Sequence, residues 1–244
     1  MHTIYAIIPA AGVGSRMQAD KPKQYLTLQG KTILEHTAAL FLQRDDIRKV
    51  IIAVSSDDPY FDFLPLANHP KVVRVNGGKE RADTVLNALK EMERLEHLVQ
   101  QEKEPEGSGC WAMVHDAARP CLQQSDIEHL IAQASTHDVG AILASPVRDT
   151  MKRGVAGGNI DHTVDRDNLW HALTPQLFPL RRLKHCLEYA LNQGYQVTDE
   201  ASAMEFSGQA PALVSGRSDN IKITRPEDLA LAHFYLMNNE EPLS

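Results

Sequence analysis

Short apolar runs alternate with longer windows of helical periodicity along most of the chain. The runs are almost continuously apolar, as expected for strands that helices cover on both faces. The predicted strands are Ile4–Pro9, Lys49–Val54, Lys71–Val75, Trp111–His115, Gly140–Pro146 and Pro211–Val214. The predicted helices are Ile33–Leu42, Arg81–Leu98, Ser125–Thr136, Leu180–Gln193, Asp199–Phe206 and Pro226–Met237. This alternation predicts right-handed crossovers and an α/β fold, with a mostly parallel sheet flanked by helices.

Three of the predicted helices start with the pattern of a capping box. In this motif a side-chain hydroxyl accepts a hydrogen bond from an early amide, and a Glu three residues later reaches back. The pairs are Thr32 with Glu35, Ser125 with Glu128, and Thr224 with Glu227. The pattern therefore predicts where these helices begin.

Two segments interrupt the alternation. Residues Gln100–Gly109 are charged, contain Pro and Gly, and lack an apolar face, which predicts a solvated surface loop. Residues Val147–Leu173 form a long excursion with glycines near its middle, which predicts a hairpin or arm projecting from the sheet. Compact domains seldom carry such an excursion without a purpose, and contact with a partner is the purpose we expect.

The composition is that of one globular domain spanning residues 1–244. With 25 Lys and Arg against 32 Asp and Glu, the formal net charge is −7, and 43% of the residues are hydrophobic. An acidic balance argues against a nucleic-acid coat or a binder of anionic membranes, because such proteins present a basic surface. It does not exclude a small anionic substrate, because a few well-placed cations can bind one.

Three further features predict a cytoplasmic protein. The longest apolar runs, such as Val50–Val54, have about five residues, whereas a membrane span needs about 20. The first residues lack the pattern of a secretory signal. Cys110, Cys121 and Cys186 are odd in number and widely spaced, which predicts reduced thiols without a disulfide framework or zinc site.

The strongest candidate for a ligand-binding loop follows the first predicted strand. The sequence PAAGVGSRM, residues 9–17, ends the strand in small residues that let backbone amides approach an anion. Arg16, and Lys23 in the PKQY segment that follows, add two cations. The loop is neither a Walker A motif nor Gly-x-Gly-x-x-Gly, because Met17 occupies the third glycine position. A plain strand–helix turn is the alternative, but the cations favour a phosphate-binding loop.

Two more candidates lie at the ends of later strands. Residues Gly77–Thr84 offer exposed amides and a hydroxyl that could contact a nucleobase; an ordinary turn and helix cap is the alternative. In His115–Pro120, the Asp116 carboxylate could face a magnesium ion or substrate hydroxyls, since Mg²⁺ prefers oxygen ligands. The alternative is that Asp116 caps a turn and pairs with Arg119.

Cationic residues in the second half of the chain are weaker candidates. Thr150 and Arg166 on the arm are suitable donors to a phosphate monoester, although an Arg on a hairpin is more often merely solvated. Lys222 lies in an apolar, strand-like context, where a snorkelling lysine is the usual interpretation.

Taken together and in this order, the motifs resemble the 2-C-methyl-D-erythritol 4-phosphate cytidylyltransferase family of non-mevalonate isoprenoid synthesis. The resemblance runs from Ile4 to about Leu236. Each motif alone is weak, but the combination is specific: PAAGxGxRM, PKQY, GGxxR, HDAARP, PVRDT, TVDR, LTPQ and DNIKxT. The family implies a Rossmann-like fold and a homodimer formed through the extended arm.

The resemblance also implies the reaction and the residue roles. CTP and 2-C-methyl-D-erythritol 4-phosphate would give CDP-methylerythritol and pyrophosphate with Mg²⁺, which is held mainly by the CTP phosphates. The residues that match charge-stabilising and phosphate-positioning roles are Arg16, Lys23, Arg166 and Lys222. Those that match the CTP site are Ala10, Ala11, Gly12, Gly78, Lys79 and Thr84. Those that match the polyol site are Asp116, Arg119, Thr150 and Thr174, with Asp116 also a metal candidate.

Other functions remain open at the level of sequence. A related cytidylyltransferase acting on ribitol 5-phosphate would share the CTP loop and differ in the polyol pocket. A catalytically silent nucleotide-binding protein would not need Lys23 beside Arg16, nor Lys222. A dinucleotide oxidoreductase is disfavoured by the missing third glycine. Two departures from the family pattern stand out: Thr84 where we expect Ser, and Lys79 where we expect an acidic residue.

Overall fold

The computed structural model describes residues 2–12, 17, 20–100 and 109–238. A seven-stranded sheet forms its centre, in the order β11-β7-β10-β6-β1-β4-β5. The strands are β1 (Thr3–Pro9), β4 (Ile47–Val54), β5 (Val72–Asn76), β6 (Cys110–Val114), β7 (Ala141–Pro146), β10 (Trp170–Pro179) and β11 (Ala212–Ser215). All neighbouring pairs are parallel except those of β10, which runs antiparallel to β6 and β7. The predicted α/β fold is confirmed.

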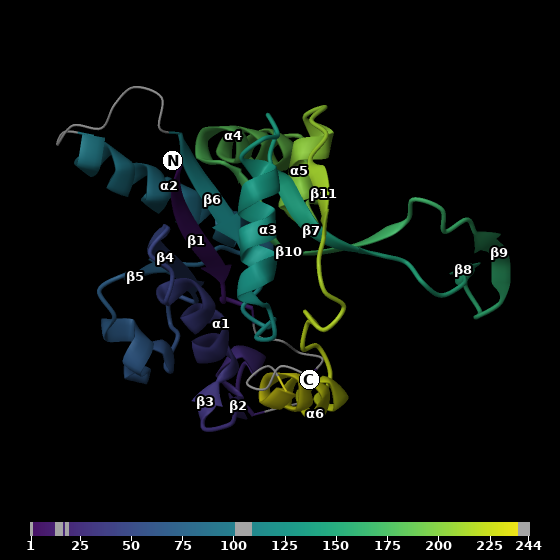
Figure 1. Cartoon of the computed structure of the whole chain (residues 1–244), viewed down its shortest axis with the longest axis horizontal. Helices are drawn as coiled ribbons and strands as arrows, with labels where there is room; N and C mark the ends of the chain where they lie inside the picture. The colour runs from purple at the N-terminus through teal and green to yellow at the C-terminus, as the bar shows by residue number, and fades with distance from the viewer. Residues whose placement is uncertain (1, 13–16, 18–19, 101–108, 239–244) are drawn as a thin grey trace.

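All six predicted helices are present with bounds within two residues of the prediction. They are α1 (Ile33–Leu42), α2 (Arg81–Gln100), α3 (Gln124–Ala134), α4 (Leu180–Asn192), α5 (Glu200–Phe206) and α6 (Pro226–Asn238). Helices α1 and α3 pack on one face of the sheet, and α2, α4 and α5 pack on the other (Figure 1). No helix in the described ranges is long and apolar enough to cross a membrane.

The two faces follow from alternation along the central strand. In β1, Ile4, Ala6 and Ile8 join the core beneath α1 and α3. Tyr5 and Ile7 point to the opposite side and join the core beneath α2 and α4. A strand in the middle of a two-sided sheet must be apolar at successive positions, which is why β1 reads as an uninterrupted apolar run.

Two of the three predicted capping boxes are wrong. At Thr32 the motif is confirmed, because the Glu35 amide donates to the Thr32 hydroxyl over 3.1 Å and the Thr32 amide donates back over 2.7 Å. Helix α3 begins before Ser125, and its box joins Gln123 to Asp126. At α6, Asp228 rather than Glu227 accepts from the Thr224 amide, over 2.8 Å. In both cases a carboxylate other than the expected one reaches the free amides, two positions before it at α3 and one position after it at α6.

Strand β10 is the one strand of the seven-stranded sheet that was not predicted from the sequence. It contains Pro175 and ends at Pro179, and proline cannot donate to a sheet ladder, so the pattern argued against a strand. Its first residue, Trp170, already pairs with Pro146 of β7. The last residues of the predicted arm, Trp170–Leu173, therefore belong to the sheet.

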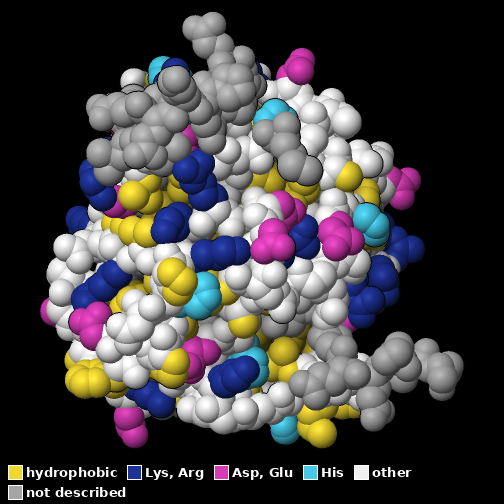
Figure 2. All heavy atoms as spheres, turned by 60° about the vertical axis from the view of Figure 1, so that its left-hand side comes forward, with side chains coloured by type: hydrophobic (Ala, Val, Ile, Leu, Met, Phe, Trp, Pro, Cys, Tyr) yellow, Lys and Arg dark blue, Asp and Glu magenta, His cyan; other side chains and the backbone are white. Residues whose placement is uncertain are grey.

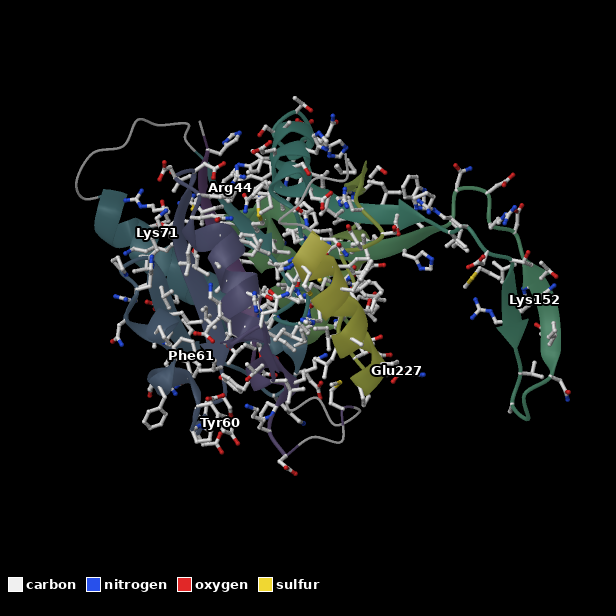
Figure 3. All side chains as sticks on the ribbon, turned by 60° about the horizontal axis from the view of Figure 1, so that its bottom comes forward. Arg44, Tyr60, Phe61, Lys71, Lys152 and Glu227 are labelled. Atoms are coloured by element: carbon white, nitrogen blue, oxygen red, sulfur yellow. The ribbon has the colours of Figure 1, made fainter. Side chains whose placement is uncertain are left out.

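The rest of the predicted arm projects from the body of the molecule (Figure 1). Its tip is the antiparallel hairpin of β8 (Met151–Gly154) and β9 (Ile160–Val164). Lys152, whose ammonium donates to the Thr163 hydroxyl over 2.6 Å, lies well away from the sheet in Figure 3.

Small elements complete the fold. A two-stranded ribbon, β2 (Thr27–Leu28) and β3 (Lys31–Thr32), precedes α1. It lies beside α6 in Figure 1, and a third apolar cluster joins Leu28 and Ile33 to Ala232. The predicted loop at Gln100–Gly109 lies mostly outside the described residues.

Candidate active site

A cavity of about 260 Å³ lies at the carboxyl ends of β1, β5 and β6. In the sheet, β1 lies between β4 and β6. After β1 the chain continues to β4 on one side, and after β6 it continues to β7 on the opposite side. Ligands of open α/β sheets bind at such a switch point, because the diverging loops leave a crevice there. The lining residues are Pro9–Gly12, Lys23, Gln24, Gly78–Arg81, Thr84, Asp116–Ala118 and Lys222.

The loop after β1 is held in place by hydrogen bonds from a buried glutamine. The Gln24 side-chain amide donates to the Ala10 carbonyl over 2.7 Å and to the Gly12 carbonyl over 3.1 Å. Gly12 itself has open space where a Cβ would stand. Gln24 thus fixes the start of the predicted phosphate loop, whereas Arg16 lies outside the described residues.

Lys23 reaches the other end of the chain. It starts a short 3-10 helix, Lys23–Tyr25, anchored by the buried Tyr25, whose hydroxyl donates to Asp58 over 2.8 Å. The Lys23 ammonium donates to the Ile223 carbonyl over 2.9 Å. This bond brings Lys23 next to the segment that carries Lys222, and both ammonium-bearing side chains line the same cavity.

The loop after β5 approaches the loop after β1 closely. A Cβ on Gly77 would lie 2.4 Å from the Cβ of Ala11, and one on Gly78 would lie 2.3 Å from the Cβ of Asp83. Only glycine fits at either position without movement of the backbone. Gly77 is therefore required for packing this loop against the loop after β1, and Gly78 for packing it against the start of α2.

The Thr84 hydroxyl is largely committed within this loop. It accepts from the Gly78 amide over 2.9 Å and donates to the Glu80 carbonyl over 3.0 Å. A hydroxyl has one proton and two lone pairs, so one lone pair remains. Thr84 holds Gly78 in place and can only accept a hydrogen bond from a ligand.

Three cations surround the carboxylate of Asp116. Its Oδ1 accepts from Arg81 Nε at 3.2 Å, and its Oδ2 lies 3.3 Å from Arg119 Nε and 2.9 Å from Lys222 Nζ. Burial by itself raises the pKa of the Asp116 carboxyl, but Arg81, Lys222 and Arg119 together hold that pKa well below its usual range. Asp116 is thus an anion at any pH at which the protein works, and it orients the three cations.

Arg81 is held in turn by a buried glutamate. Its two terminal nitrogens donate to Glu200 Oε1 and Oε2 over 2.7 and 3.1 Å, which is a bidentate pair. Glu200, the first residue of α5, is fully buried. Asp199 caps α5 by accepting from the Ser202 amide, and it also accepts from Gln176 of β10.

A second cavity adjoins the first on the far side of Asp116. Both cavities share Arg81, Asp116 and Lys222, and the second also includes Arg119 and Thr174. Arg119 donates to the Asn220 carbonyl over 2.6 Å, and the Asp116 amide donates to the Thr174 hydroxyl over 3.1 Å. The site therefore has two compartments with a shared wall of charged side chains.

Comparison with known proteins identifies the family. The family model described as 2-C-methyl-D-erythritol 4-phosphate cytidylyltransferase matches residues 4–238. The chain belongs to this family. A relative of that name from Vibrio cholerae is 58% identical over 241 residues, which cover 99% of each chain. Another from Escherichia coli is 54% identical over 234 residues, covering 96% of this chain and 93% of the relative.

Solved structures agree with this assignment. A crystal structure titled 4-diphosphocytidyl-2C-methyl-D-erythritol synthase matches with a TM-score of 0.80 at 36% identity, covering 97% of this chain and 99% of the other. The 2-C-methyl-D-erythritol 4-phosphate cytidylyltransferase of Francisella tularensis matches with a TM-score of 0.77, also at 36% identity, over 96% and 99% of the chains.

Within this cytidylyltransferase, the structure brings most of the predicted site residues together. Of the described ones, only Thr150 and Arg166 are absent from the lining of the two cavities. Both are exposed on the arm, where the Arg166 guanidinium donates to the Arg148 carbonyl. The arm projects from the body of the molecule (Figure 1), and Arg148, the partner of Arg166, borders a further cavity together with Arg119 and Lys222.

The described side chains of this cytidylyltransferase include no clustered set of metal ligands. The described residues contain no group of three His, Cys, Asp or Glu side chains able to hold an ion. The Asp116 oxygens already have three cationic partners.

Four residues of the site were not assigned a role from the sequence. Gln24, Arg81 and His115 stand inside quoted motifs, so their position was a usable signal. Glu200 lies 119 residues from Arg81 and in no quoted motif, so only the fold reveals it.

Proposed function

We propose that this protein transfers CMP from CTP to 2-C-methyl-D-erythritol 4-phosphate, giving CDP-methylerythritol and pyrophosphate. The observation that carries the proposal is the convergence of the loop after β1, the Gly77–Gly78 loop, Lys23 and Lys222 on one cavity. Membership of the family, over nearly the whole chain, supports this substrate pair over ribitol 5-phosphate.

CTP occupies the first compartment. The triphosphate lies on the loop Ala10–Gly12, near Lys23 and Arg16, where the small residues allow close approach of the backbone. The base lies against Gly78, Lys79 and Thr84. The exocyclic amino group of cytosine is a donor, which suits the single lone pair left on the Thr84 hydroxyl.

The reaction is a displacement at phosphorus. A phosphate oxygen of the polyol phosphate forms a bond to the α-phosphorus of CTP, and the bond from that phosphorus to the bridging oxygen of pyrophosphate breaks. Negative charge is crowded around the α-phosphorus, so fixed cations lower the barrier more than a proton-transfer group would. Lys23 and Arg16 supply that charge, and Lys222 positions the attacking phosphate.

The polyol phosphate occupies the second compartment. Asp116, Arg119 and Thr174 face its hydroxyl groups, and Lys222 faces its phosphate. Thr150 and Arg166 complete the phosphate site from the arm of a second copy of the chain, in a homodimer. The exposure of both side chains on a projecting arm supports this arrangement.

Mg²⁺ enters with the triphosphate, whose oxygens are its main ligands. When bound, it neutralises phosphate charge. The enzyme works in the cytoplasm. Neither nucleic acid nor membrane is a partner, and acidic and basic side chains are interspersed on the face drawn in Figure 2.

The test is pyrophosphate release from CTP and Mg²⁺ with two acceptors in parallel. We expect turnover with 2-C-methyl-D-erythritol 4-phosphate and a kcat/KM at least about 100-fold lower with ribitol 5-phosphate, because unpaired polar groups penalise the wrong polyol. Preference for ribitol 5-phosphate would overturn the choice of substrate. CTP binding without pyrophosphate release would favour a silent nucleotide-binding protein.

A further inference from the structure

His115 follows β6 directly, is fully buried, and takes no part in the chemistry described above. Both of its ring nitrogens have partners. Nε2 lies 3.0 Å from the carbonyl oxygen of Arg119, and Nδ1 lies 3.0 Å from the hydroxyl of Thr174. The ring thus connects a turn of the polyol compartment to a strand residue that lines it.

The identity of these partners fixes the protons. A carbonyl oxygen can only accept, so Nε2 carries the hydrogen that faces Arg119. Burial lowers the pKa of His115 to about 4, so the ring is neutral near pH 7. Nδ1 therefore carries a lone pair, and the Thr174 hydroxyl must donate to it.

This arrangement determines which hydrogen bonds the Thr174 hydroxyl can still make. Its oxygen also accepts from the Asp116 amide over 3.1 Å. With its proton given to His115 and one lone pair given to Asp116, the hydroxyl has a single lone pair left. Thr174 lines the second compartment beside Arg119 and Lys222, so that lone pair is what a ligand there can use.

We propose that His115 is a positioning residue that makes Thr174 a pure acceptor, so that the polyol compartment selects a substrate presenting a hydroxyl donor at that point. The neighbouring donors, Arg119 and Lys222, donate hydrogen bonds to acceptor atoms of the same ligand. The identity of the ligand in this inference rests on the proposed function. The arrangement of protons on His115 and Thr174 does not depend on the proposed function.

The proton arrangement is tested on the wild-type protein without any assay of turnover. Nitrogen-15 NMR of the histidine side chains distinguishes the two neutral tautomers. We expect one histidine that stays neutral from pH 7 down to pH 5.5 and carries its proton on Nε2. A proton on Nδ1 of that ring would overturn the proposal, because Thr174 would then be free to donate.

Two isosteric substitutions separate the two bonds of the ring. In His115→Gln, the side-chain amide can replace Nε2 and donate to Arg119, but nothing replaces Nδ1. In His115→Asn, the side-chain oxygen can replace Nδ1 and accept from Thr174, but the bond to Arg119 is lost.

The proposal predicts a KM for the polyol phosphate about 5- to 20-fold higher in His115→Gln, with the KM for CTP unchanged, because a reoriented hydroxyl opposes the substrate donor. The rise should be smaller in His115→Asn. A His115→Gln enzyme with the wild-type KM for the polyol phosphate would overturn the proposal.

His36→Gln is the matched control. His36 also places Nε2 against a backbone carbonyl, that of Leu28 at 2.8 Å, but it lies outside both compartments. It should leave both KM values unchanged.

A double-mutant cycle with Thr174→Val tests whether His115 acts through Thr174. In the Thr174→Val background, His115→Gln should cause no further rise in the KM for the polyol phosphate. Additive effects would overturn the coupling. If the wild-type enzyme releases no pyrophosphate, the proposed function fails, whereas the tautomer measurement still decides the arrangement of Thr174.

Discussion

Asp116 and Glu200 share the work of holding the cations of the site. Asp116 contacts Arg81, Arg119 and Lys222, and Glu200 takes the far side of Arg81 in a bidentate pair. Together the two carboxylates neutralise cationic side chains that are partly buried and would otherwise lack a partner of opposite charge. Removal of Glu200 leaves Arg81 with only its 3.2 Å contact to Asp116, and removal of Asp116 leaves Arg119 without a carboxylate partner. Loss of one partner of a buried ion pair costs more than the intact pair contributes.

Glu200→Gln should therefore lower the free energy of unfolding by about 2–3 kcal/mol, measured by urea denaturation. It should also raise the KM for the polyol phosphate, because Arg81 no longer holds Asp116 in place. Glu96→Gln is the control, since Glu96 is also buried but accepts from Tyr5 and lies near the end of α2 opposite to Arg81. That control should lose stability without a change in KM, and a Glu200→Gln enzyme as stable as wild type would contradict the prediction.

Lys23→Ala should reduce kcat by about 100- to 1,000-fold, because the charge it removes matters most in the transition state. Steady-state kinetics with both substrates would measure this. Lys49→Ala is a suitable control, since Lys49 also donates to a backbone carbonyl, that of Pro70, but lies away from the cavity. A Lys23→Ala enzyme that lost only CTP affinity would contradict the assigned role.

Among the elements, the arm stands out by its exposure, since every residue of β8 and all but one of β9 are exposed. An isolated two-stranded hairpin is marginally stable in water at best. Its side chains Met151, Val155 and Ile160 are all exposed, at 37%, 50% and 65%. Covering this apolar surface with a second copy of the chain would stabilise the hairpin and bring Arg166 to a neighbouring site.

Arg166→Ala should raise the KM for the polyol phosphate about 10- to 100-fold and leave the KM for CTP nearly unchanged, since a charged donor to the phosphate is lost. Arg153→Ala removes an exposed arginine from β8 of the same hairpin and should have little effect. An unchanged KM in Arg166→Ala would mean that the arm does not reach the substrate.

At the scale of the whole molecule, mixed dimers test the exchange of arms. If Arg166 acts on the partner's site, a heterodimer of Arg166→Ala and Lys23→Ala chains contains one complete site. Equal mixing after reversible dissociation should then give about one quarter of the wild-type activity, since half of the dimers are mixed. No recovery on mixing would place Arg166 in its own site or outside any site.

The stability of the whole protein should depend on the neutral state of His115. The pKa of the buried ring is about 4, below the ordinary value of 6.5, so the unfolded chain binds a proton more readily. The stability that comes from keeping His115 neutral is fully present above pH 6.5 and is lost as the pH falls through 4. It amounts to about 3 kcal/mol between pH 7 and pH 4.

Urea denaturation at several pH values would measure this dependence. The difference between wild type and His115→Gln should be largest near pH 7 and shrink toward pH 4, because only wild type carries the buried histidine. A difference that stays constant with pH would show that His115 does not titrate on unfolding.

The amino-acid pattern alone specifies most of the elements and the loops of the site. Apolar periodicity and local capping and turn residues predict all six helices and every strand of the seven-stranded sheet except β10, but not the short strands β2 and β3. The loops after Pro9, Val75 and His115 could be predicted to meet, because the carboxyl ends of parallel strands share one edge of a sheet. Strand β10 was not predicted because it contains Pro175 and Pro179, and prolines usually mark the end of a strand.

Only the tertiary structure decided which charges pair and which atoms face a ligand. Lys23 donates to a carbonyl 200 residues away, and Arg81 pairs with Glu200 across 119 residues. The donor and acceptor roles of Thr84 and Thr174 depend on partners that only the fold supplies. Local patterns carry no information about such contacts, since they arise when separate elements pack and each buried polar group must find a partner.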